Sequence, residues 1–276
     1  MRILCRTIAI YVALSLRATF SYSQSSYIEL GIAPGLSFFR DKATSPLFYI
    51  GNTLSFIGAW HSTNNSNERL ASISYTSGKH TNNYNNTNNS ARFYNLELNF
   101  SKLYLLNRLS SDKWKTKIGA GVISTLNIRE NKALMNNSLG IENISNIVFS
   151  TKITRDILHL FSSKTKFQYG KKNKSPTKRE LSFLLNIGIV NLNYRPGYAY
   201  NYLPSIDNSY VRNMSDHHLS INGFRLNSGI QYSKFLSNKN ILRISYIFDA
   251  YNAPGQHEPF NYAKHSLKFS LLYNYK

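Results

Sequence analysis

The sequence has little cysteine, little acidic charge and no long apolar run after its N-terminus. Its 276 residues include one cysteine, 2 tryptophans, 14 glycines and 7 prolines. One cysteine cannot close an intramolecular disulfide, so a disulfide-stabilised secreted scaffold is excluded. Beyond residue 24 no segment reaches the roughly 18 consecutive apolar residues of a membrane-spanning helix. A chain of this kind enters a membrane only as a closed barrel, because lipid leaves no other way to satisfy every strand hydrogen bond.

The N-terminus predicts a signal peptide. Basic Arg2 and Arg6 precede an apolar run from Thr7 to Leu16. At about ten residues this run is too short for a spanning helix, which needs roughly 20. Small and polar residues follow, and we expect cleavage near Ser23 or Gln24. The mature chain would then have no thiol, no disulfide and no lipid attachment point.

Acidic residues are scarce, with 13 against 33 basic residues and a formal net charge of +20. Removing Arg2, Arg6 and Arg17 with the signal peptide leaves 30 basic residues and a net charge of +17. This excess either faces an anionic neighbour or serves only solubility. Because an exported chain seldom meets nucleic acid, phosphorylated lipid headgroups are the neighbour that we expect.

What the sequence has in abundance is period-two alternation, together with 20 tyrosines and 16 phenylalanines. It is clearest from Lys113 to Arg129, where Ile118 and Val122 lie on one face and Lys115 and Lys117 on the other. Such alternation is typical of strands with one apolar face. Ten strands are expected, with clear alternation in 94–101, 113–129, 181–189, 219–235, 242–249 and 266–275, and weaker alternation in Tyr27–Phe39, Phe48–His61, Glu68–Lys79 and Ile144–Thr154.

The predicted connections alternate between long and short, as they do in membrane barrels. The expected external loops are residues 40–47, 80–91, 130–143, 195–217 and 251–263, and the expected periplasmic turns are 62–67, 109–112, 155–179 and 236–240. The segment 155–179 is the exception, because it is too long and too basic for an ordinary turn. If it contains another hairpin through Lys164–Tyr169, the strand count becomes twelve; the other interpretation is a short periplasmic helix.

Together these features resemble the outer-membrane β-barrel proteins. The chain has a predicted signal peptide, repeated segments of about ten residues with period-two alternation, and a last amphipathic strand with Tyr273 and Tyr275. It departs from the family in its last residue, Lys276, where these proteins commonly end in an aromatic residue. The resemblance implies a signal peptide over 1–24 and one porin-like antiparallel transmembrane barrel over 25–276, exported to the outer membrane of a gram-negative-type bacterium. It also implies contact with lipid, with lipopolysaccharide and with the barrel-assembly machinery. The structural rival is a secreted β-sandwich, which shares the same alternation.

Charged residues on the polar face of these strands would point into the lumen of a barrel. Ten strands enclose an interior that side chains nearly fill, so the first interpretation is a packed charged plug. The second is a narrow pathway whose basic lining favours small anions. The predicted lumen residues are Glu97, Lys115, Lys117, Lys152, Arg225, Arg243, Asp249 and Lys268.

Some barrel proteins are hydrolases, and one cluster of residues suits that chemistry. Asp216, His217 and His218 end the longest predicted external loop, where an Asp-polarised His could activate water or a serine. The alternative is that the two histidines point to opposite sides of the next strand and meet only solvent. His257 could join them only if two loops meet, and no strong metal-ligand spacing exists. We predict no metal and no cofactor.

A basic segment lies in the exceptional connection 155–179. It could bind an anionic cell-wall polymer or acidic protein face if it is periplasmic, or lipopolysaccharide phosphates if it is external; a solvated loop is the third interpretation. It has little aromatic interleaving, so no nucleic-acid site is predicted. The residues of this segment are Lys171, Lys172, Lys174, Lys178 and Arg179.

Two functional hypotheses follow. The first is a non-enzymatic barrel with a structural, adhesive or narrow-pore role that acts through its external loops. The second is an outer-surface barrel hydrolase that acts on lipid or peptide, with its centre at His217 and His218. The two hypotheses differ in whether imidazoles and carboxylates converge above the barrel mouth.

Overall fold

The computed structural model describes residues 25–64, 66–82, 89–137, 139–157, 178–196, 217–255 and 258–275. The predicted signal peptide lies outside these ranges. Within them the chain is almost entirely β-strand, with two short 3₁₀ helices, Asn107–Leu109 (η2) and Lys132–Asn137 (η3). No helix among the described residues is long and apolar enough to cross a membrane. The strands are β1 (Ser25–Asp41), β2 (Tyr49–Thr63), β3 (Asn67–Asn82), β4 (Asn89–Leu105), β5 (Trp114–Glu130), β6 (Leu139–Asp156), β7 (Arg179–Pro196), β8 (His217–Ile221), β9 (Phe224–Phe235), β10 (Ile241–Ala253) and β11 (Phe260–Asn274).

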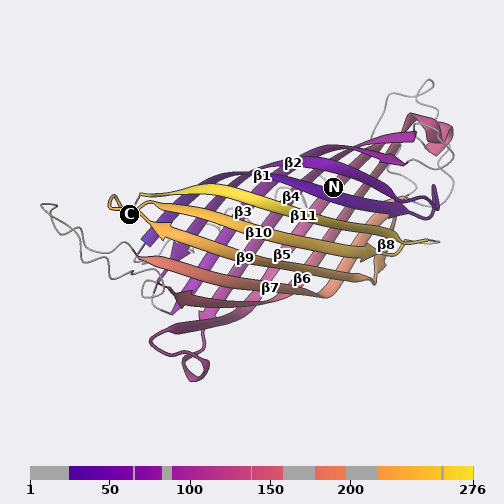
Figure 1. The fold of residues 1–276 in the computed structure, drawn as a ribbon. Helices are drawn as coiled ribbons and strands as arrows, with labels where there is room; N and C mark the ends of the chain where they lie inside the picture. The colour runs from indigo at the N-terminus through magenta and orange to yellow at the C-terminus, as the bar shows by residue number, and fades with distance from the viewer. Residues whose placement is uncertain are drawn as a thin grey trace, which may run out of the picture.

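These strands close into a single antiparallel barrel (Figure 1). From β1 to β7 each strand pairs with the next in sequence, β8 and β9 both pair with β7, and β9 pairs with β10, β10 with β11 and β11 with β1. A closed ring has no free edges, so the sandwich rival is excluded. Because β6 and β7 are direct partners, a hairpin within 155–179 has no place in the ring. The barrel is therefore ten strands around, as the alternation predicts. We call each of these ten strand positions a stave, because one of them is shared by two strands.

Strands β8 and β9 form one stave with a break between them. Leu192 pairs with Ile221, and Ile187 pairs with Leu226, so both pairs have residue numbers that sum to 413 and the register is unchanged. The sequence predicts one continuous strand here, and the difference lies at Gly223, whose φ of +99° leaves the extended region. A Cβ on this glycine would also lie 2.3 Å from a backbone oxygen, so glycine is required at the break.

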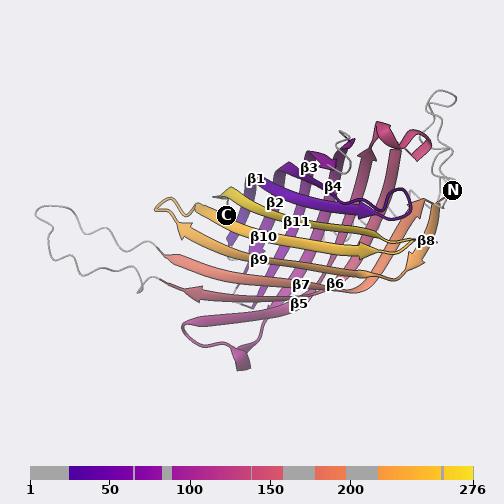
Figure 2. The ribbon, with the colours of Figure 1, turned by 45° about the vertical axis from the view of Figure 1, so that its right-hand side comes forward.

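The strands are strongly staggered around the ring. Following cross-strand partners once around from Glu130 of β5 leads through Leu36 and Leu185 back to Ile118, 12 residues lower on β5. A stagger of this size accompanies the strand tilt of about 35–45° that barrels adopt. Figure 2 shows the tilt as strands that run obliquely across the barrel.

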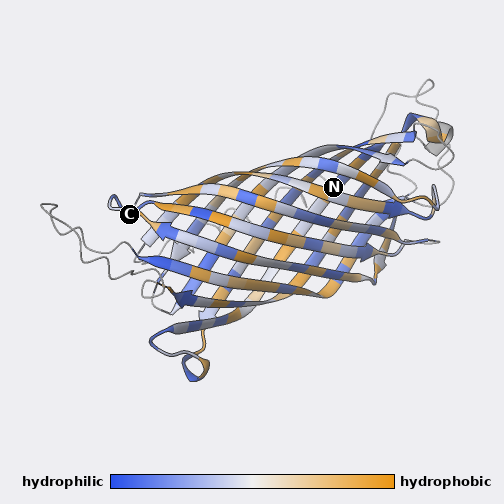
Figure 3. Ribbon diagram, in the orientation of Figure 1, coloured by the Kyte–Doolittle hydropathy of each residue, from blue (hydrophilic) through white to orange (hydrophobic). Residues whose placement is uncertain are grey.

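The two faces of the barrel differ in chemistry. On β1, Leu30 and Ile32 are 68% and 49% exposed, whereas Glu29 and Ala33 beside them are 1% and 2% exposed. Figure 3 shows the resulting alternation of apolar and polar residues along the strands. Apolar side chains therefore cover the outside, and polar ones line the lumen except near the mouth, where buried aromatic residues face inward. Exposed apolar residues on the other staves include Phe56, Ile73, Leu98, Val122, Phe149, Phe183, Ile230, Ile244 and Phe269.

Connections of different length gather at the two ends. One end, the turn end, joins strands through 64–66, 106–113, 157–178 and 236–240, and it also holds the beginning of β1 and the end of β11. The other end, the mouth, joins strands through 42–48, 83–88, 131–138, 197–216 and 254–259. The predicted loops at the mouth were too wide: β3 continues to Asn82 and β11 begins at Phe260. The strands continue there because inward-facing side chains pack inside the barrel above its apolar belt.

Candidate functional site: a closed lumen

Six aromatic rings fill the lumen near the mouth. These residues, which we call the aromatic plug, come from β1, β2, β4, β10 and β11 and are at most 4% exposed. Five of the rings form a closed cycle and the sixth, Tyr49, stacks on Phe39 of that cycle; the centroids of adjacent rings lie 4.9–6.1 Å apart. This spacing is that of packed aromatic pairs, so little space for solvent is left between the rings. The aromatic plug consists of Phe39, Tyr49, Phe93, Tyr251, Phe260 and Tyr262.

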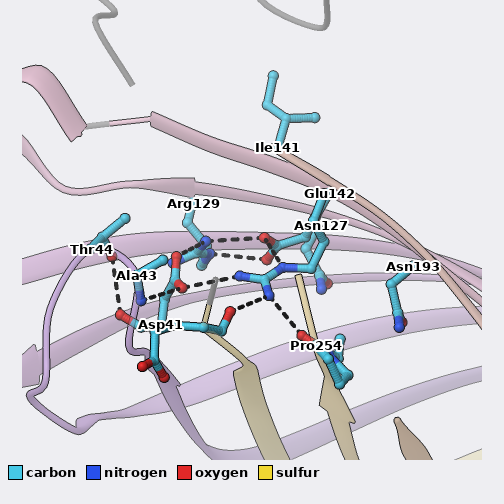
Figure 4. Close-up of polar contacts among 12 residues, drawn as sticks. Asp41, Ala43, Thr44, Asn127, Arg129, Ile141, Glu142, Asn193 and Pro254 are labelled. Atoms are coloured by element: carbon cyan, nitrogen blue, oxygen red, sulfur yellow. Dashed lines mark hydrogen bonds and ion pairs between the residues drawn. The ribbon is translucent and has the colours of Figure 1, made fainter. Parts of the chain in front are cut away.

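Four buried charges lie beside the plug at the mouth and form the mouth network. Arg129 donates hydrogen bonds to Asp41 at 2.7 Å and to both carboxylate oxygens of Glu142 at 3.1 Å. Arg195 donates to the other oxygen of Asp41 at 3.1 Å. Figure 4 shows Arg129 directed toward both acids. Two cations and two carboxylates balance, so the network carries no net charge.

The mouth network also holds two connections in place. Nη1 of Arg195 donates to the backbone oxygens of Ala253 and Glu258, at 2.7 and 2.8 Å. Asp41 accepts a hydrogen bond from the amide of Ala43, 3.3 Å away, within the next connection along the chain. A buried arginine that binds backbone oxygens on both sides of a loop fixes the path of that loop.

A second charged cluster lies next to the plug and is centred on Arg225, whose side chain is fully buried. Its guanidinium donates to Glu97 at 2.5 Å and to both oxygens of Asp249 at 2.8 and 3.1 Å. The remaining donors bond Thr125 at 2.7 Å and Asn146 at 3.2 Å. All five N–H groups of the guanidinium are thereby used.

The turn end holds two more clusters, each built on one carboxylate. Glu29 accepts a hydrogen bond from His61 at 2.5 Å and forms ion pairs with Lys268 at 2.8 Å and with Arg243 at 3.6 Å. The lumen is therefore lined with cations at this end, but these cations already have an acidic partner.

The other cluster at the turn end consists of one carboxylate and two lysines. Glu68 pairs with Lys117 at 2.8 Å and with Lys152 at 2.5 Å. All three side chains are 11–13% exposed. Two cations share one carboxylate, so the cluster carries one excess positive charge.

A chamber lies between the charged clusters. Its volume open to the centres of water molecules is about 140 Å³, enough for about ten waters at the usual requirement of 10–15 Å³ each. It exists because small side chains face inward at this level. Its uncharged polar lining is Ser55, Ser72, Ser74, Asn99, Ser101, Asn186, Asn227, Gln231 and Ser266.

Seven of the eight predicted lumen residues lie in these clusters. Lys115 is different, because it is exposed at the turn end of β5, opposite Thr154 in the register. The seven that lie inside are Glu97, Lys117, Lys152, Arg225, Arg243, Asp249 and Lys268.

The predicted catalytic residues do not gather among the described residues. His217 packs against Tyr194, with ring centroids 4.9 Å apart, and its Nε2 donates to the backbone oxygen of Ile141 at 2.7 Å. His218 pairs with Arg195 in the register and is exposed. Asp216 lies outside the described residues, as does His257, so the catalytic site stays a prediction. No group of three possible metal ligands occurs in the described part of the chain.

The basic segment is only partly described. Lys178 pairs with Glu180 at 2.6 Å and lies over the ring of Phe235, 4.7 Å from its centroid. Arg179 begins β7 at the turn end, opposite Lys234. The other three residues of the segment, Lys171, Lys172 and Lys174, lie outside the described residues, and their proposed contacts stay predictions.

Sequence reasoning found Glu97 and Asp249 but missed the aromatic plug and the other acids that hold lumen cations, Glu29, Asp41, Glu68 and Glu142. Phe93 lies four residues before Glu97, so alternation places both side chains on the same face of the strand. This spacing was a signal in the sequence that Phe93 points inward. Glu142 and Tyr251 lie in segments predicted as loops, because the alternation changes beyond the apolar belt. The partners of Arg129 could not be read from the sequence, since they lie on strands that only barrel closure brings together.

Comparison with solved structures found proteins that this chain resembles. The Escherichia coli outer membrane protease OmpT is 8% identical, with 91% of this chain and 96% of that chain covered and a TM-score of 0.49. The translocator domain of the autotransporter NalP from Neisseria meningitidis is 9% identical, with 97% of each chain covered and a TM-score of 0.46. No family model and no curated protein matches the sequence. At these identities and TM-scores the likenesses assign no role to this chain, and the closed antiparallel barrel rests on its own strand pairings.

Proposed function

We propose that the chain is an exported outer-membrane β-barrel with a closed lumen, which serves as a structural or adhesive platform at the cell surface. The closed, aromatic-filled interior is the observation that carries this proposal. According to this proposal, the signal peptide is cleaved and the barrel-assembly machinery inserts the mature chain into the outer membrane of a gram-negative-type cell. Its external loops then make the contacts on which its role depends.

The outer surface supports a position in lipid. Exposed leucine, isoleucine and phenylalanine side chains surround the barrel, for example those of Phe56, Ile73 and Phe269. A soluble barrel would expose polar side chains there and bury the apolar ones. We assign the turn end, which holds the beginning of β1 and the end of β11, to the periplasmic side, following the predicted order of turns and loops. The mouth would then face outward.

The mouth also supports contact with lipopolysaccharide. Outward-facing Lys79 and Arg92 are direct partners across β3 and β4, and Arg40 on β1 lies over the ring of Phe48, 4.7 Å from its centroid. These cations lie near the upper edge of the apolar belt. Phosphate groups on the lipid would neutralise them there.

The aromatic plug and the paired charges argue against an open pore. A water-filled pore needs a continuous polar path, yet Phe39, Phe93 and Tyr262 stack across the lumen and are at most 4% exposed. The Arg225 cluster lies next to them with every donor used. An anion would therefore meet aromatic rings and engaged cations rather than water and free charge.

Planar-bilayer recording of the refolded mature protein tests this proposal. We expect no long-lived conductance from the natural sequence at moderate voltage. A double variant, Phe93→Ala with Tyr262→Ala, should conduct, because the two truncations remove stacked rings from the plug. A matched control, Phe100→Ala with Tyr104→Ala, removes the same two ring types from the outer face of β4 and should stay closed. Steady conductance from the natural protein would contradict the closed lumen.

A further inference from the structure

The chamber inside the barrel is lined by polar side chains that have no partner in the protein. Ser72 on β3 and Asn99 on β4 are direct cross-strand partners, and both line the chamber. Neither side chain forms a hydrogen bond with any residue that the structure describes, and the same is true of Ser74, Ser101 and Ser266. The hydroxyl and amide groups of these five residues are therefore available to water or to a polar solute.

The cations at the turn end of the chamber outnumber the carboxylates. In each of the two clusters there, one carboxylate is shared by two cations. The two clusters together carry two positive charges in excess, without counting His61. A lysine ammonium has three N–H donors, and Lys152 and Lys268 each direct one of them to a carboxylate. Donors therefore remain for an anion even though both lysines are paired.

Three of these cations belong to the wall of the chamber itself. They are Lys152 from β6, Arg243 from β10 and Lys268 from β11. Lys268 lies two residues from Ser266 on the inner face of β11, so its charge adjoins the unpartnered hydroxyl groups. Excess positive charge in an enclosed polar cavity attracts anions, and the low dielectric of the surrounding protein strengthens that attraction.

The opposite end of the chamber is electrically balanced. Lys264 lines the chamber there and is the direct cross-strand partner of Asp249. Together with Arg225 it balances the two carboxylates of that cluster, Glu97 and Asp249. The aromatic plug lies beyond this level, toward the mouth. At the turn end, by contrast, the four cations are 10–13% exposed, so solvent reaches them. An anion would therefore enter from the turn end.

We infer that the chamber binds one small oxyanion of the phosphate type. Lys152, Arg243 and Lys268 balance its charge, and its oxygens accept hydrogen bonds from groups such as Ser72 and Asn99. The inference rests on the proposed closed lumen and adds a class of ligand and the side from which it enters. The bound anion does not cross the barrel, because the plug blocks its path to the mouth.

Isothermal titration calorimetry of the refolded mature barrel with inorganic phosphate tests the inference. Chloride keeps the ionic strength equal in every titration. We expect one phosphate per barrel, displaced by sulfate but not by glucose, which offers hydroxyl groups without charge. The variant Lys152→Gln with Lys268→Gln leaves each carboxylate with one cation, so neither acid is left unpaired. It should raise the Kd for phosphate about thirty-fold, because two cations no longer attract the anion.

A second variant separates space from charge. Ser72→Leu with Ser74→Leu fills part of the chamber and leaves every charge in place, so phosphate binding should also be lost. The matched control is Lys113→Gln with Lys115→Gln. It removes the same charge from two exposed residues at the turn end, and its Kd for phosphate should equal that of the natural barrel.

The inference is overturned if the natural barrel binds no phosphate, if glucose displaces phosphate, or if the control loses binding as much as the lysine variant. Unchanged binding in either chamber variant would overturn it as well. Bilayer recording distinguishes this inference from the proposed function. A barrel that stays closed and binds no phosphate overturns the anion site alone, whereas a natural barrel that conducts steadily overturns the closed lumen.

Discussion

At the scale of single residues, the lumen depends on charges that cannot be removed one at a time. Arg225 is fully buried and uses all five donors, on Glu97, Asp249, Thr125 and Asn146. Burying such a cation costs free energy of desolvation, and its hydrogen bonds and ion pairs offset this cost only while all of its partners remain. Removing it leaves the Glu97 and Asp249 carboxylates without the guanidinium that pairs with both of them.

Arg225→Met should therefore lower the free energy of unfolding by about 3–5 kcal/mol. Urea unfolding of the refolded barrel in detergent micelles measures this change. Arg108→Met, at an exposed turn residue, should change it by less than about 0.5 kcal/mol. Adding Glu97→Gln and Asp249→Asn to Arg225→Met should recover most of the loss, because the unpaired charges are then gone. Equal stability of the Arg225 and Arg108 variants would contradict a buried, fully paired Arg225.

Glycine positions give a second prediction at this scale. A Cβ on Gly119 of β5 would lie 1.9 Å from the backbone oxygen of Lys102, whereas a Cβ on Gly58 of β2 has its nearest contact at 3.7 Å. Gly119→Ala should destabilise the barrel by about 1–3 kcal/mol, because the neighbouring strand must move. Gly58→Ala should be tolerated. The same urea titration checks both, and a larger loss for Gly58→Ala would show that the register between β4 and β5 is wrong.

At the scale of elements, the parity of each strand could be predicted, but the strand ends could not. Alternation from Lys113 to Arg129 correctly separates the lumen face from the lipid face of β5. Beyond the apolar belt the pattern changes, because aromatic residues such as Phe260 and Tyr262 face inward there. A rule that places apolar residues outside assigns this stretch to a loop. The break at Gly223 was also missed, since it depends on a positive φ that alternation does not reveal.

The loop after β10 gives the prediction that belongs to this scale. Arg195 on β7 holds this loop through the backbone oxygens of Ala253 and Glu258. Arg195→Gln removes the charge and shortens the reach, so hydrogen exchange in residues 251–263 should become faster. Exchange in the middle of β10, at Ile244 and Tyr246, should stay slow. Lys42→Gln, at an exposed residue of the neighbouring connection, is the control and should leave both regions unchanged.

Uniformly slow exchange in 251–263 of the Arg195→Gln variant would mean that this loop is held by other contacts. Uniformly fast exchange through β10 would mean that the mouth network stabilises the whole stave and not only the loop. Either result would contradict a role for Arg195 as the local anchor of this loop.

At the scale of the whole molecule, ring closure decides which side chains meet. The sequence placed Glu97, Arg225 and Asp249 on lumen faces because each is polar at the right parity. It could not pair them, because Glu97 and Arg225 lie on β4 and β9, which meet only across the lumen. The stagger of 12 residues around the ring sets the height at which each side chain lies along the barrel. This stagger follows from the full set of strand registers.

The orientation of alternate side chains toward lipid is the central claim, and a single-cysteine spin-label scan of β11 tests it most directly. The predicted mature chain has no cysteine, so each label is unique. In lipid vesicles, labels at Leu267, Phe269 and Leu271 should be accessible to oxygen and shielded from a water-soluble nickel complex. Labels at Lys268 and Ser270 should show low accessibility to oxygen. A scan without period two, or with the opposite phase, would contradict a barrel whose apolar face meets lipid.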